Sequence, residues 1–287
     1  MKGVPLSHPK AFVVGHPIRH SRSPSIHGHW LREHGLAGAY ERVDVAPEDF
    51  EKFFRTFPER GFRGGNVTIP HKEAAFRLAH DTTERARRLE AVNTVWIEDG
   101  RIHGDNTDVT GFVASLDQAL GPWSAGTALV LGAGGAARGV IAGLLEREFK
   151  RIIVANRTDG KAQELVRFAP DRIESTAWRN IPEGLRGADL LVNTTSCGMA
   201  GHPPLDVDIS PLPDHAVVTD LVYVPLETAL LAQARARGFR AVDGVGMLLH
   251  QAAPGFARWF GVTPAVTPEL RALIEADIEG RASGARP

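Results

Sequence analysis

Short apolar runs alternate with longer amphipathic segments along this chain of 287 residues. In its first part, Ala11–Gly15, Tyr40–Val45 and Gly64–Ile69 have the composition of strands. Ser23-Pro24 opens a predicted helix through about Glu33, because serine suits the N-cap and proline suits the first helical position. Glu48–Phe57 has a helical period as well. Strands that alternate with helices in this way predict an α/β fold.

The same alternation continues to the end of the chain. Further strands are predicted over Ala91–Glu98, Arg101–His103, Leu190–Asn193, Ala216–Asp220 and Ala241–Val242, and further helices over Pro70–Ala79, Val109–Leu120, Met247–Phe260 and Pro268–Ile278. Asp99-Gly100 lies between two of the strands and predicts a tight hairpin. Gly121–Ser124 is expected to lead from one domain into the next.

A glycine-rich loop stands between an apolar run and a helical pattern at Thr127–Arg138, and a second apolar run follows at Ile152–Ala155. This is the strand, turn, helix and strand order of a dinucleotide-binding unit. Gly132 would permit the tight turn, Gly134 would let the backbone approach a pyrophosphate, and small Ala137 would let the helix pack close to the strand. The N–H groups and the helix dipole would then face the phosphates.

The residues after the second apolar run bear on which dinucleotide is bound. An acidic residue usually binds the ribose of NAD near this position, but here Asn156 is followed by Arg157. A guanidinium can bind a 2′-phosphate, which predicts NADP rather than NAD. The alternative is that Arg157 is a solvated loop cation and that Thr158 simply caps a helix over Gly160–Phe168.

Composition and charge restrict the function further. Hydrophobic residues make up 43% of the chain and charged residues 23%, with a net charge of −1, so neither disorder nor binding to nucleic acid or anionic lipid is indicated. No signal peptide or membrane span is expected, and the single Cys197 suggests a reducing cytoplasm. The 12 histidines have no zinc-type spacing, so no metal site is predicted.

Three polar clusters in the first 108 residues are candidates for the chemistry. Strand alternation puts Asn66 and Thr68 on one face, and Lys72 follows in the first turn of the next helix. The other clusters are Ala91–Thr94 and Gly104–Asp108. Each also has a structural explanation, since a lysine in a first turn is usually solvated, and Thr107 or Asp108 could simply cap a helix.

Taken together with the glycine loop, these clusters resemble one family, the shikimate dehydrogenases. The motifs that carry the resemblance are Ser21-Arg-Ser-Pro24, Asn66-Val-Thr-Ile-Pro-His-Lys72, Ala91-Val-Asn-Thr94, Gly104-Asp-Asn-Thr-Asp108, Gly132-Ala-Gly-Gly-Ala-Ala-Arg138, Asn156-Arg-Thr158 and Asp243-Gly-Val-Gly-Met-Leu-Leu-His-Gln251. The resemblance implies the reversible reduction of 3-dehydroshikimate to shikimate by NADPH, in the pathway to chorismate and the aromatic amino acids.

The resemblance also implies roles for single residues. Lys72 and Asp108 would be the catalytic pair, with Lys72 giving a proton to the developing alkoxide and Asp108 holding the ammonium in place. The substrate would be bound by Ser21, Ser23, Asn66, Thr68, Lys72, Asn93, Asp108, Tyr223 and Gln251. The cofactor would be bound by Glu84, Gly132, Ala133, Gly134, Gly135, Ala136, Asn156, Arg157, Thr158, Asp159, Gly160, Lys161, Leu221, Gly244 and Met247.

The implied architecture has two α/β domains. Residues 1–108 would form the substrate domain, residues 109–243 a doubly wound Rossmann-type NADP domain, and residues 244–287 would be helices that pack back on the first domain. The enzyme would act on a small molecule as a monomer or homodimer.

Three alternatives stay open beside this prediction. The first is a relative that oxidises quinate as well as shikimate, often with NAD. The second is a methylene-tetrahydrofolate-type dehydrogenase, and the third is a non-catalytic sensor of shikimate or nucleotide. The chain also departs from the family at Glu90, where glycine is frequent, at Val224, where a polar residue is frequent, and at the variable His71.

Overall fold

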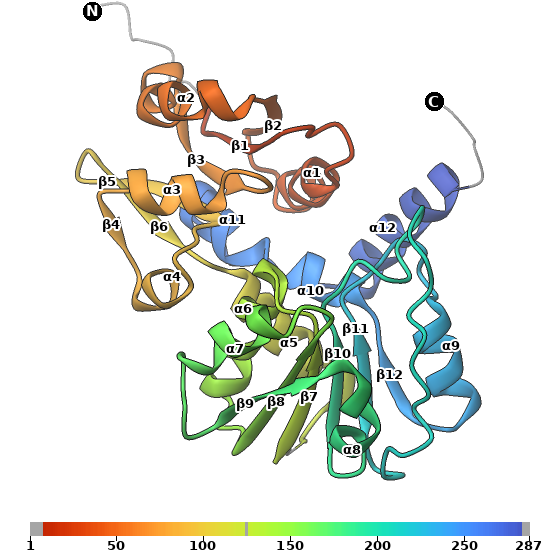
Figure 1. The fold of residues 1–287 in the computed structure, drawn as a ribbon. Helices are drawn as coiled ribbons and strands as arrows, with labels where there is room; N and C mark the ends of the chain where they lie inside the picture. Colours follow the sequence, from red (N-terminus) through yellow and green to blue (C-terminus); the bar gives the residue numbers. More distant parts are fainter. Residues whose placement is uncertain (1–7, 124–125, 283–287) are drawn as a thin grey trace, which may run out of the picture. The chain divides into compact units, whose positions relative to one another are not determined.

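The computed structural model of this chain describes residues 8–123 and 126–282, which form two compact units (Figure 1). One unit contains the chain up to Thr107 together with Gln251–Leu270. The other contains Asp108–His250 and the chain from Arg271 onward. Each unit is built around its own six-stranded sheet.

The sheet of the first unit has the order β2-β1-β3-β5-β6-β4. Its strands are β1 (Lys10–Gly15), β2 (Ala39–Asp44), β3 (Phe62–Val67), β4 (Asp81–Thr82), β5 (Thr94–Glu98) and β6 (Arg101–Asp105). β1 is parallel to β2 and β3, whereas β5 is antiparallel to both β3 and β6. The β5–β6 turn has positive φ at Asp99 and Gly100, as the predicted hairpin requires.

Helices cover both faces of the first sheet. They are α1 (Ser23–Glu33), α2 (Phe50–Thr56), α3 (Lys72–Leu78), α4 (Glu84–Leu89) and α11 (Ala253–Phe260), with 3-10 turns η1 (Pro47–Asp49) and η2 (Pro58–Arg60). A phenylalanine-rich core joins α2, α3 and α4 to the sheet, with Phe12 in edge contact with three other rings. α11 contacts β3 and β5, and Trp259 donates to Val95 O at 2.8 Å.

The sheet of the second unit is entirely parallel, with the order β12-β11-β10-β7-β8-β9. Its strands are β7 (Thr127–Leu131), β8 (Arg151–Asn156), β9 (Ile173–Ala177), β10 (Leu190–Asn193), β11 (Val217–Asp220) and β12 (Arg240–Val242). Counted within this unit, the order is 3-2-1-4-5-6, the doubly wound order of dinucleotide-binding folds.

The four central strands of this sheet, β7, β8, β10 and β11, are buried on both faces. Ala128 and Val130 belong to one hydrophobic cluster, and Leu129 and Leu131 belong to another, as strand alternation requires. The surrounding helices are α5 (Asp108–Leu120), α6 (Gly135–Glu146), α7 (Asp159–Val166), α8 (Ile181–Leu185), α9 (Ala229–Ala236), α10 (Gly244–His250) and α12 (Pro268–Ala282), with the 3-10 turn η3 (Trp178–Asn180). The predicted fold class is therefore confirmed.

The late helices divide between the two units. α11 lies on the first sheet, whereas α10 packs along α5 in the second unit. Gly246 permits this packing, because a Cβ at that position would lie 2.2 Å from Ser115 Oγ. The assignment of roles to residues 1–108, 109–243 and 244–287 stays a prediction, since contacts within the chain assign no role.

Some local expectations differ from the structure. Arg22, not Ser23, occupies the N-cap of α1, and Pro24 is the second helical residue. The short helices α4 and α9 and the strand β9 carry no strong periodicity and are not predicted by it, although α4 is capped by Thr83. Ser124, at the end of the predicted connection between domains, lies outside the described residues.

Among the described residues, no helix combines the length and apolar character needed to cross a bilayer. Over residues 8–123 and 126–282, no group of three or more His, Cys, Asp or Glu side chains is arranged to hold a metal ion.

Candidate functional site

Four segments of the first unit meet at one edge of its sheet. β1, β3 and β6 end there, and β5 begins there because it runs antiparallel to β3 and β6. Backbone bonds join the segments, from Thr68 N to Val14 O at 2.9 Å and from Asn93 N to Asp105 O at 3.0 Å. The predicted polar clusters are thereby brought together, although they are far apart in the sequence.

The loop after β1 is held by the neighbouring edge strand β2. Arg42 donates to Ser21 O from Nε at 3.1 Å and from Nη2 at 2.7 Å. Ser23 is buried, and its backbone N–H donates to Ser21 Oγ at 3.3 Å. Asp44 accepts from His16 at 2.6 Å, and this bond lowers the pKa of the Asp44 carboxyl. The two serines of the predicted substrate site are therefore held together, Ser21 in this loop and Ser23 as the first residue of α1.

Asn66 lies at the end of β3 and is only 5% exposed. Its Nδ2 donates to Thr94 Oγ1 at 3.1 Å and to Asn93 O at 3.3 Å. Its Oδ1 accepts from the Tyr40 hydroxyl at 2.5 Å. Burial raises the pKa of Tyr40 well above its usual range, so the phenol remains a neutral donor.

Asn93 is also buried, and three groups lie within hydrogen-bond distance of its Oδ1. Thr107 N donates to it at 2.7 Å, and the hydroxyl oxygens of Thr94 and Thr107 lie 3.0 Å and 3.1 Å away. The Thr107 hydroxyl has its shortest acceptor in Gln251 O, at 2.8 Å. Gln251 lies between α10 and α11, so this bond fixes the chain before α11 at this edge of the sheet. The Thr107 hydroxyl thus lies between Asn93 Oδ1 and Gln251 O.

Lys72 is the first residue of α3 and is half-buried. The residue before it, His71, is buried and stacks on Phe50 at 4.2 Å, and its Nε2 lies 2.8 Å from Val45 O. Burial lowers the pKa of His71, which makes this residue a neutral anchor for the helix start. Asp108, the other half of the predicted pair, begins α5 in the second unit, so their pairing stays a prediction.

The predicted glycine loop follows β7 at the point where the strand order of the second sheet reverses. Gly132 has φ +107°, and a Cβ there would lie 2.6 Å from Thr194 Oγ1, which donates to Leu131 O at 2.7 Å. By contrast, a Cβ at Gly134 or Gly135 would meet no atom within 4 Å. The turn therefore needs glycine at the first position for folding, and the next glycines border open space at the start of α6.

Two further features of α6 match the expected arrangement. Ala137 is fully buried in the core between the helix and the sheet. A Cβ at Gly139, about one turn into α6, would lie 3.7 Å from the Cβ of Asp108. The first residue of α5 therefore lies beside the helix that begins at the glycine loop.

The segment after β8 is exposed from Arg157 through Lys161. Asn156 donates from Nδ2 to Thr158 O at 2.9 Å and shapes the turn. Thr158 occupies the N-cap of α7 but makes no side-chain capping bond, and the helix begins at Asp159 rather than Gly160. Arg157 is thus placed in solvent at the end of the strand next to the glycine loop.

A buried carboxylate that the sequence did not single out organises the segment after β11. Asp220 is fully buried, and burial raises the pKa of its carboxyl. It accepts from Thr228 Oγ1 at 2.7 Å, Asn193 Nδ2 at 2.9 Å and Val222 N at 3.0 Å. These bonds fix the start of the Leu221–Tyr223 segment, which holds a predicted cofactor residue and a predicted substrate residue.

The remaining predicted cofactor residues lie in different places. A Cβ at Gly244 would lie 2.2 Å from Leu221 O, so these two backbones are in direct contact. Met247 is partly buried and packs against the core of the second unit. Glu84 is the first residue of α4 in the first unit, where it pairs with Arg88.

Glu90, one of the departures from the family's pattern, ends α4 in the left-handed conformation with φ +51°. Glycine adopts this conformation without strain, whereas a residue with a side chain adopts it at a cost. The chain nevertheless continues into Asn93 with the contacts described above, so the departure does not remove Asn93 from the cluster.

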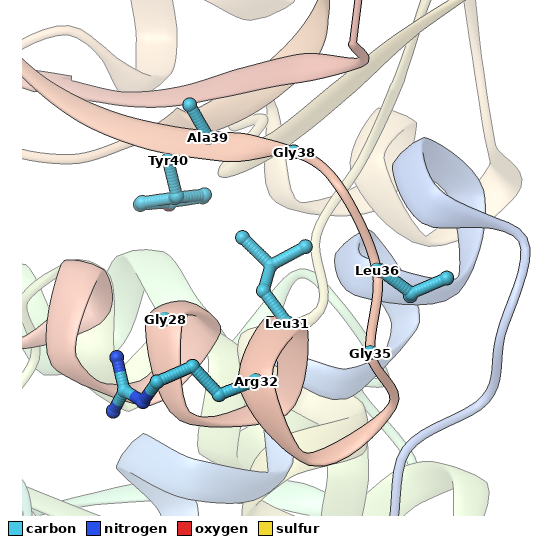
Figure 2. A pocket seen from close by; sticks show the side chains of 8 residues that line it. All are labelled: Gly28, Leu31, Arg32, Gly35, Leu36, Gly38, Ala39 and Tyr40. Carbon is cyan, nitrogen blue, oxygen red and sulfur yellow. The ribbon is translucent and has the colours of Figure 1, made fainter.

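A shallow pocket in the first unit lies away from this chemistry, between α1 and the start of β2 (Figure 2). Its lining residues are Gly28, Leu31, Arg32, Gly35, Leu36, Gly38, Ala39 and Tyr40. None of them is a carboxylate, histidine, cysteine or lysine. Its link to the polar cluster is Tyr40, whose side chain projects from β2 towards α1 in Figure 2.

Comparison with known proteins agrees with this arrangement. Three family profiles match, for the shikimate dehydrogenase substrate binding domain over residues 13–95, for shikimate/quinate 5-dehydrogenase over residues 115–200 and for the shikimate 5′-dehydrogenase C-terminal domain over residues 244–273. A protein from Methylobacterium radiotolerans named shikimate dehydrogenase (NADP(+)) is 62% identical over 277 residues, which cover 95% of this chain and 98% of the relative.

Solved structures give the same result. Quinate dehydrogenase from Corynebacterium glutamicum in complex with NAD has a TM-score of 0.86 at 32% identity, covering 93% of this chain and 98% of the other. Shikimate 5-dehydrogenase from Thermus thermophilus in complex with NADP(H) and shikimate has a TM-score of 0.82 at 36% identity, covering 94% and 98%. This chain therefore belongs to the shikimate dehydrogenase family.

Proposed function

We propose that this chain catalyses the NADP-dependent, reversible reduction of 3-dehydroshikimate to shikimate, a step of chorismate and aromatic amino acid biosynthesis. The observation that carries the proposal is the cluster of buried amide and hydroxyl groups at one edge of the first sheet, in a chain 62% identical to a protein named for this activity. A polyhydroxylated ring is recognised by such groups, because each ring hydroxyl needs a fixed donor or acceptor.

In this proposal the substrate is bound from several segments. The hydroxyls of Ser21 and Ser23 bind the substrate carboxylate. Tyr223 lies near the carboxylate in this proposal, and Asn66 belongs to the same substrate site. The ring hydroxyls are bound by Thr68, Lys72, Asn93, Asp108 and Gln251. The fixed Ser21 loop and the shared bonds of Asn93 and Thr107 support these roles, since preorganised groups lose little entropy on binding.

Lys72 and Asp108 are proposed as the catalytic pair. Reduction of a ketone builds negative charge on its oxygen, so a proton donor must lie within hydrogen-bond reach. The Lys72 ammonium gives the proton in reduction and takes it back in oxidation, and its charge stabilises the developing alkoxide. The Asp108 carboxylate holds the ammonium and accepts a bond from a ring hydroxyl.

The second unit is proposed to bind NADP, which supplies the hydride for reduction and accepts it in oxidation. The residues proposed for this role are Glu84, Gly132, Ala133, Gly134, Gly135, Ala136, Asn156, Arg157, Thr158, Asp159, Gly160, Lys161, Leu221, Gly244 and Met247. The open space at Gly134 and Gly135 before a 12-residue helix fits a pyrophosphate, and exposed Arg157 fits a 2′-phosphate.

We assign the substrate role to residues 1–108 and the cofactor role to residues 109–243, with residues 244–287 supporting the substrate role. We also place the enzyme in the cytoplasm, as a monomer or homodimer. The lone Cys197 supports a reducing compartment, and gel filtration with light scattering would determine the number of subunits.

The test is an absorbance assay for reduced nicotinamide with shikimate or quinate and with NADP⁺ or NAD⁺. We expect the highest kcat/KM for shikimate with NADP⁺. Replacement of Arg157 by Gln should lower the preference for NADP⁺ over NAD⁺ by about tenfold or more, because a charge-assisted hydrogen bond is worth about 1.5–3 kcal/mol. Faster turnover of quinate with NAD⁺ would support the quinate alternative instead.

A further inference from the structure

A continuous chain of hydrogen bonds runs through the first unit and includes two of the proposed substrate residues. It leads from Tyr40 to Asn66, Thr94 and Thr107 and ends at the backbone oxygen of Gln251. Asn66 and Gln251 belong to the proposed substrate site, whereas Tyr40, Thr94 and Thr107 have no role so far. The last three have hydroxyl groups that can bond to two neighbours at once.

Backbone groups fix the orientation of both asparagine amides in this chain. Asn93 O can only accept, so Asn66 must direct Nδ2 towards it, and Oδ1 then faces the Tyr40 hydroxyl. Thr107 N can only donate, so Asn93 must direct Oδ1 towards it. The Nδ2 group of Asn93 consequently lies on the opposite side of its carboxamide.

These fixed groups also set the direction of the hydroxyl protons. Tyr40 must donate to Asn66 Oδ1, and Thr94 Oγ1 accepts from Asn66 Nδ2 at 3.1 Å. The proton of Thr94 then goes to Asn93 Oδ1 at 3.0 Å or to Thr107 Oγ1 at 2.9 Å. The Thr107 proton has its shortest acceptor in Gln251 O, at 2.8 Å. When Thr94 donates to Thr107, the bonds from Tyr40 to Gln251 O all run in one direction, and each bond polarises the next.

Tyr40 is itself held in place by aromatic packing. The ring of His27 stacks on it at 3.9 Å with an interplanar angle of 13°, and Phe256 lies on the same histidine at 5.8 Å. His27 is fully buried, and neither of its ring nitrogens has a hydrogen-bond partner among the described residues. The histidine thus acts as an aromatic support that keeps the Tyr40 hydroxyl directed at Asn66.

We propose that Thr94 and Tyr40 are positioning residues for substrate binding, which hold the amides of Asn66 and Asn93 so that Asn93 presents its Nδ2 donor to a ring hydroxyl. This inference rests on the proposed function, because it assigns a cause to the affinity for the substrate. Thr94 is the central member, since its hydroxyl contacts Asn66, Asn93 and Thr107.

The test compares Thr94→Val, which keeps the shape and removes the hydroxyl, with Thr94→Ser, which keeps the hydroxyl and removes a methyl group. We expect Thr94→Val to raise KM for shikimate about tenfold with kcat changed less than about twofold, as for a lost contact made equally in ground and transition states. Thr94→Ser should retain KM within about twofold of the unmodified chain. Tyr40→Phe, which keeps the ring stacked on His27, should raise KM in the same way.

The dissociation constant for NADP⁺, measured by titration, should be unchanged in all three variants. The inference would be overturned if KM were equal in Thr94→Val and Thr94→Ser, or if only kcat fell. In either case the Thr94 hydroxyl would not set the affinity for shikimate. Absence of shikimate oxidation by the unmodified chain would instead overturn the proposed function, and the inference with it. The two failures are therefore distinguished by the unmodified chain.

Discussion

The candidate sites of the two units are built from different parts of the chain. In the first unit, buried side chains such as Asn66, Asn93 and Thr94 bond to one another at the edge of a mixed sheet. In the second unit, exposed backbone at Gly134 and Gly135 begins a helix at the edge of a parallel sheet. Fixed side chains can select one pattern of hydroxyls, whereas a glycine loop accepts the phosphates common to all dinucleotides.

The largest expected effect is a loss of turnover without a loss of NADP⁺ binding when Lys72 is replaced. Lys72→Ala should lower kcat by about 10²–10⁴-fold, because the proton donor for the alkoxide is lost. The dissociation constant for NADP⁺ should stay within about twofold, since no residue of the glycine loop is changed. Stopped-flow kinetics and fluorescence titration would measure the two quantities.

Lys52→Ala on the exposed surface of α2 is the matched control and should retain full turnover. Near-normal kcat in Lys72→Ala would end the assignment of Lys72 as the acid and base.

The next effect tests whether the glycine loop serves folding or binding at each position. Gly132→Ala should lower the free energy of unfolding by about 2–4 kcal/mol, because the new Cβ would lie 2.6 Å from Thr194 Oγ1 at a positive φ. Gly134→Ala should leave the unfolding free energy unchanged and weaken NADP⁺ binding about tenfold, because its Cβ would point into open space. Equal behaviour of the two variants in denaturation and titration would refute the distinction.

The buried ring of His27, which supports Tyr40 in the first unit, should make the stability of the chain depend on pH. Burial lowers the pKa of His27 from 6.5 to about 3, so between these values the unfolded chain binds a proton that the folded chain does not. Stability conferred by the neutral ring is present above pH 6.5 and is lost as the pH falls. At pH 4.5 the loss from this group should be about 3 kcal/mol.

Urea denaturation at several pH values would measure how the free energy of unfolding changes with pH. Between pH 6 and pH 4, His27→Phe should reduce the number of protons taken up on unfolding by about one, so the free energy of unfolding should change less with pH. An unchanged pH dependence in His27→Phe would contradict the buried neutral state.

The smallest effect is at Glu90, which adopts φ +51° before the segment that carries Asn93. Glu90→Gly should raise the free energy of unfolding by about 0.5–1 kcal/mol by relieving the left-handed conformation, and KM for shikimate should not change. Glu90→Ala keeps the strain and should give no gain. A gain in both variants would mean that the backbone conformation is not the cause.

The sequence predicted the parts of these sites that depend on local pattern. The glycine loop, the buried Ala137 and the hairpin at Asp99-Gly100 follow from turn chemistry and strand periodicity. The pairing of Asn66 with Thr94 across β3 and β5 did not follow, because strand register depends on contacts distant in sequence.

The sequence pattern also did not predict which polar residues are buried. Nothing local distinguishes Asp220 or His27 from exposed residues of the same type, although Asp220 ends an apolar run. Tyr40 and Thr94 lie in predicted strands, but their hydrogen-bond partners come from other segments. The predicted N-cap of α1 lies one residue too late, because Ser23 is followed by a proline that is tolerated at the second helical position as well.

The central claim is that Lys72 and Asp108 bind the ring hydroxyl whose carbon exchanges a hydride with NADP. A crystal structure of the chain with shikimate and NADP⁺ tests it most directly. We expect Lys72 Nζ and the Asp108 carboxylate within about 3.2 Å of one ring hydroxyl, with the nicotinamide C4 facing the carbon that bears it. Lys72 and Asp108 at different parts of the ring, or a nicotinamide turned away from that carbon, would contradict the account.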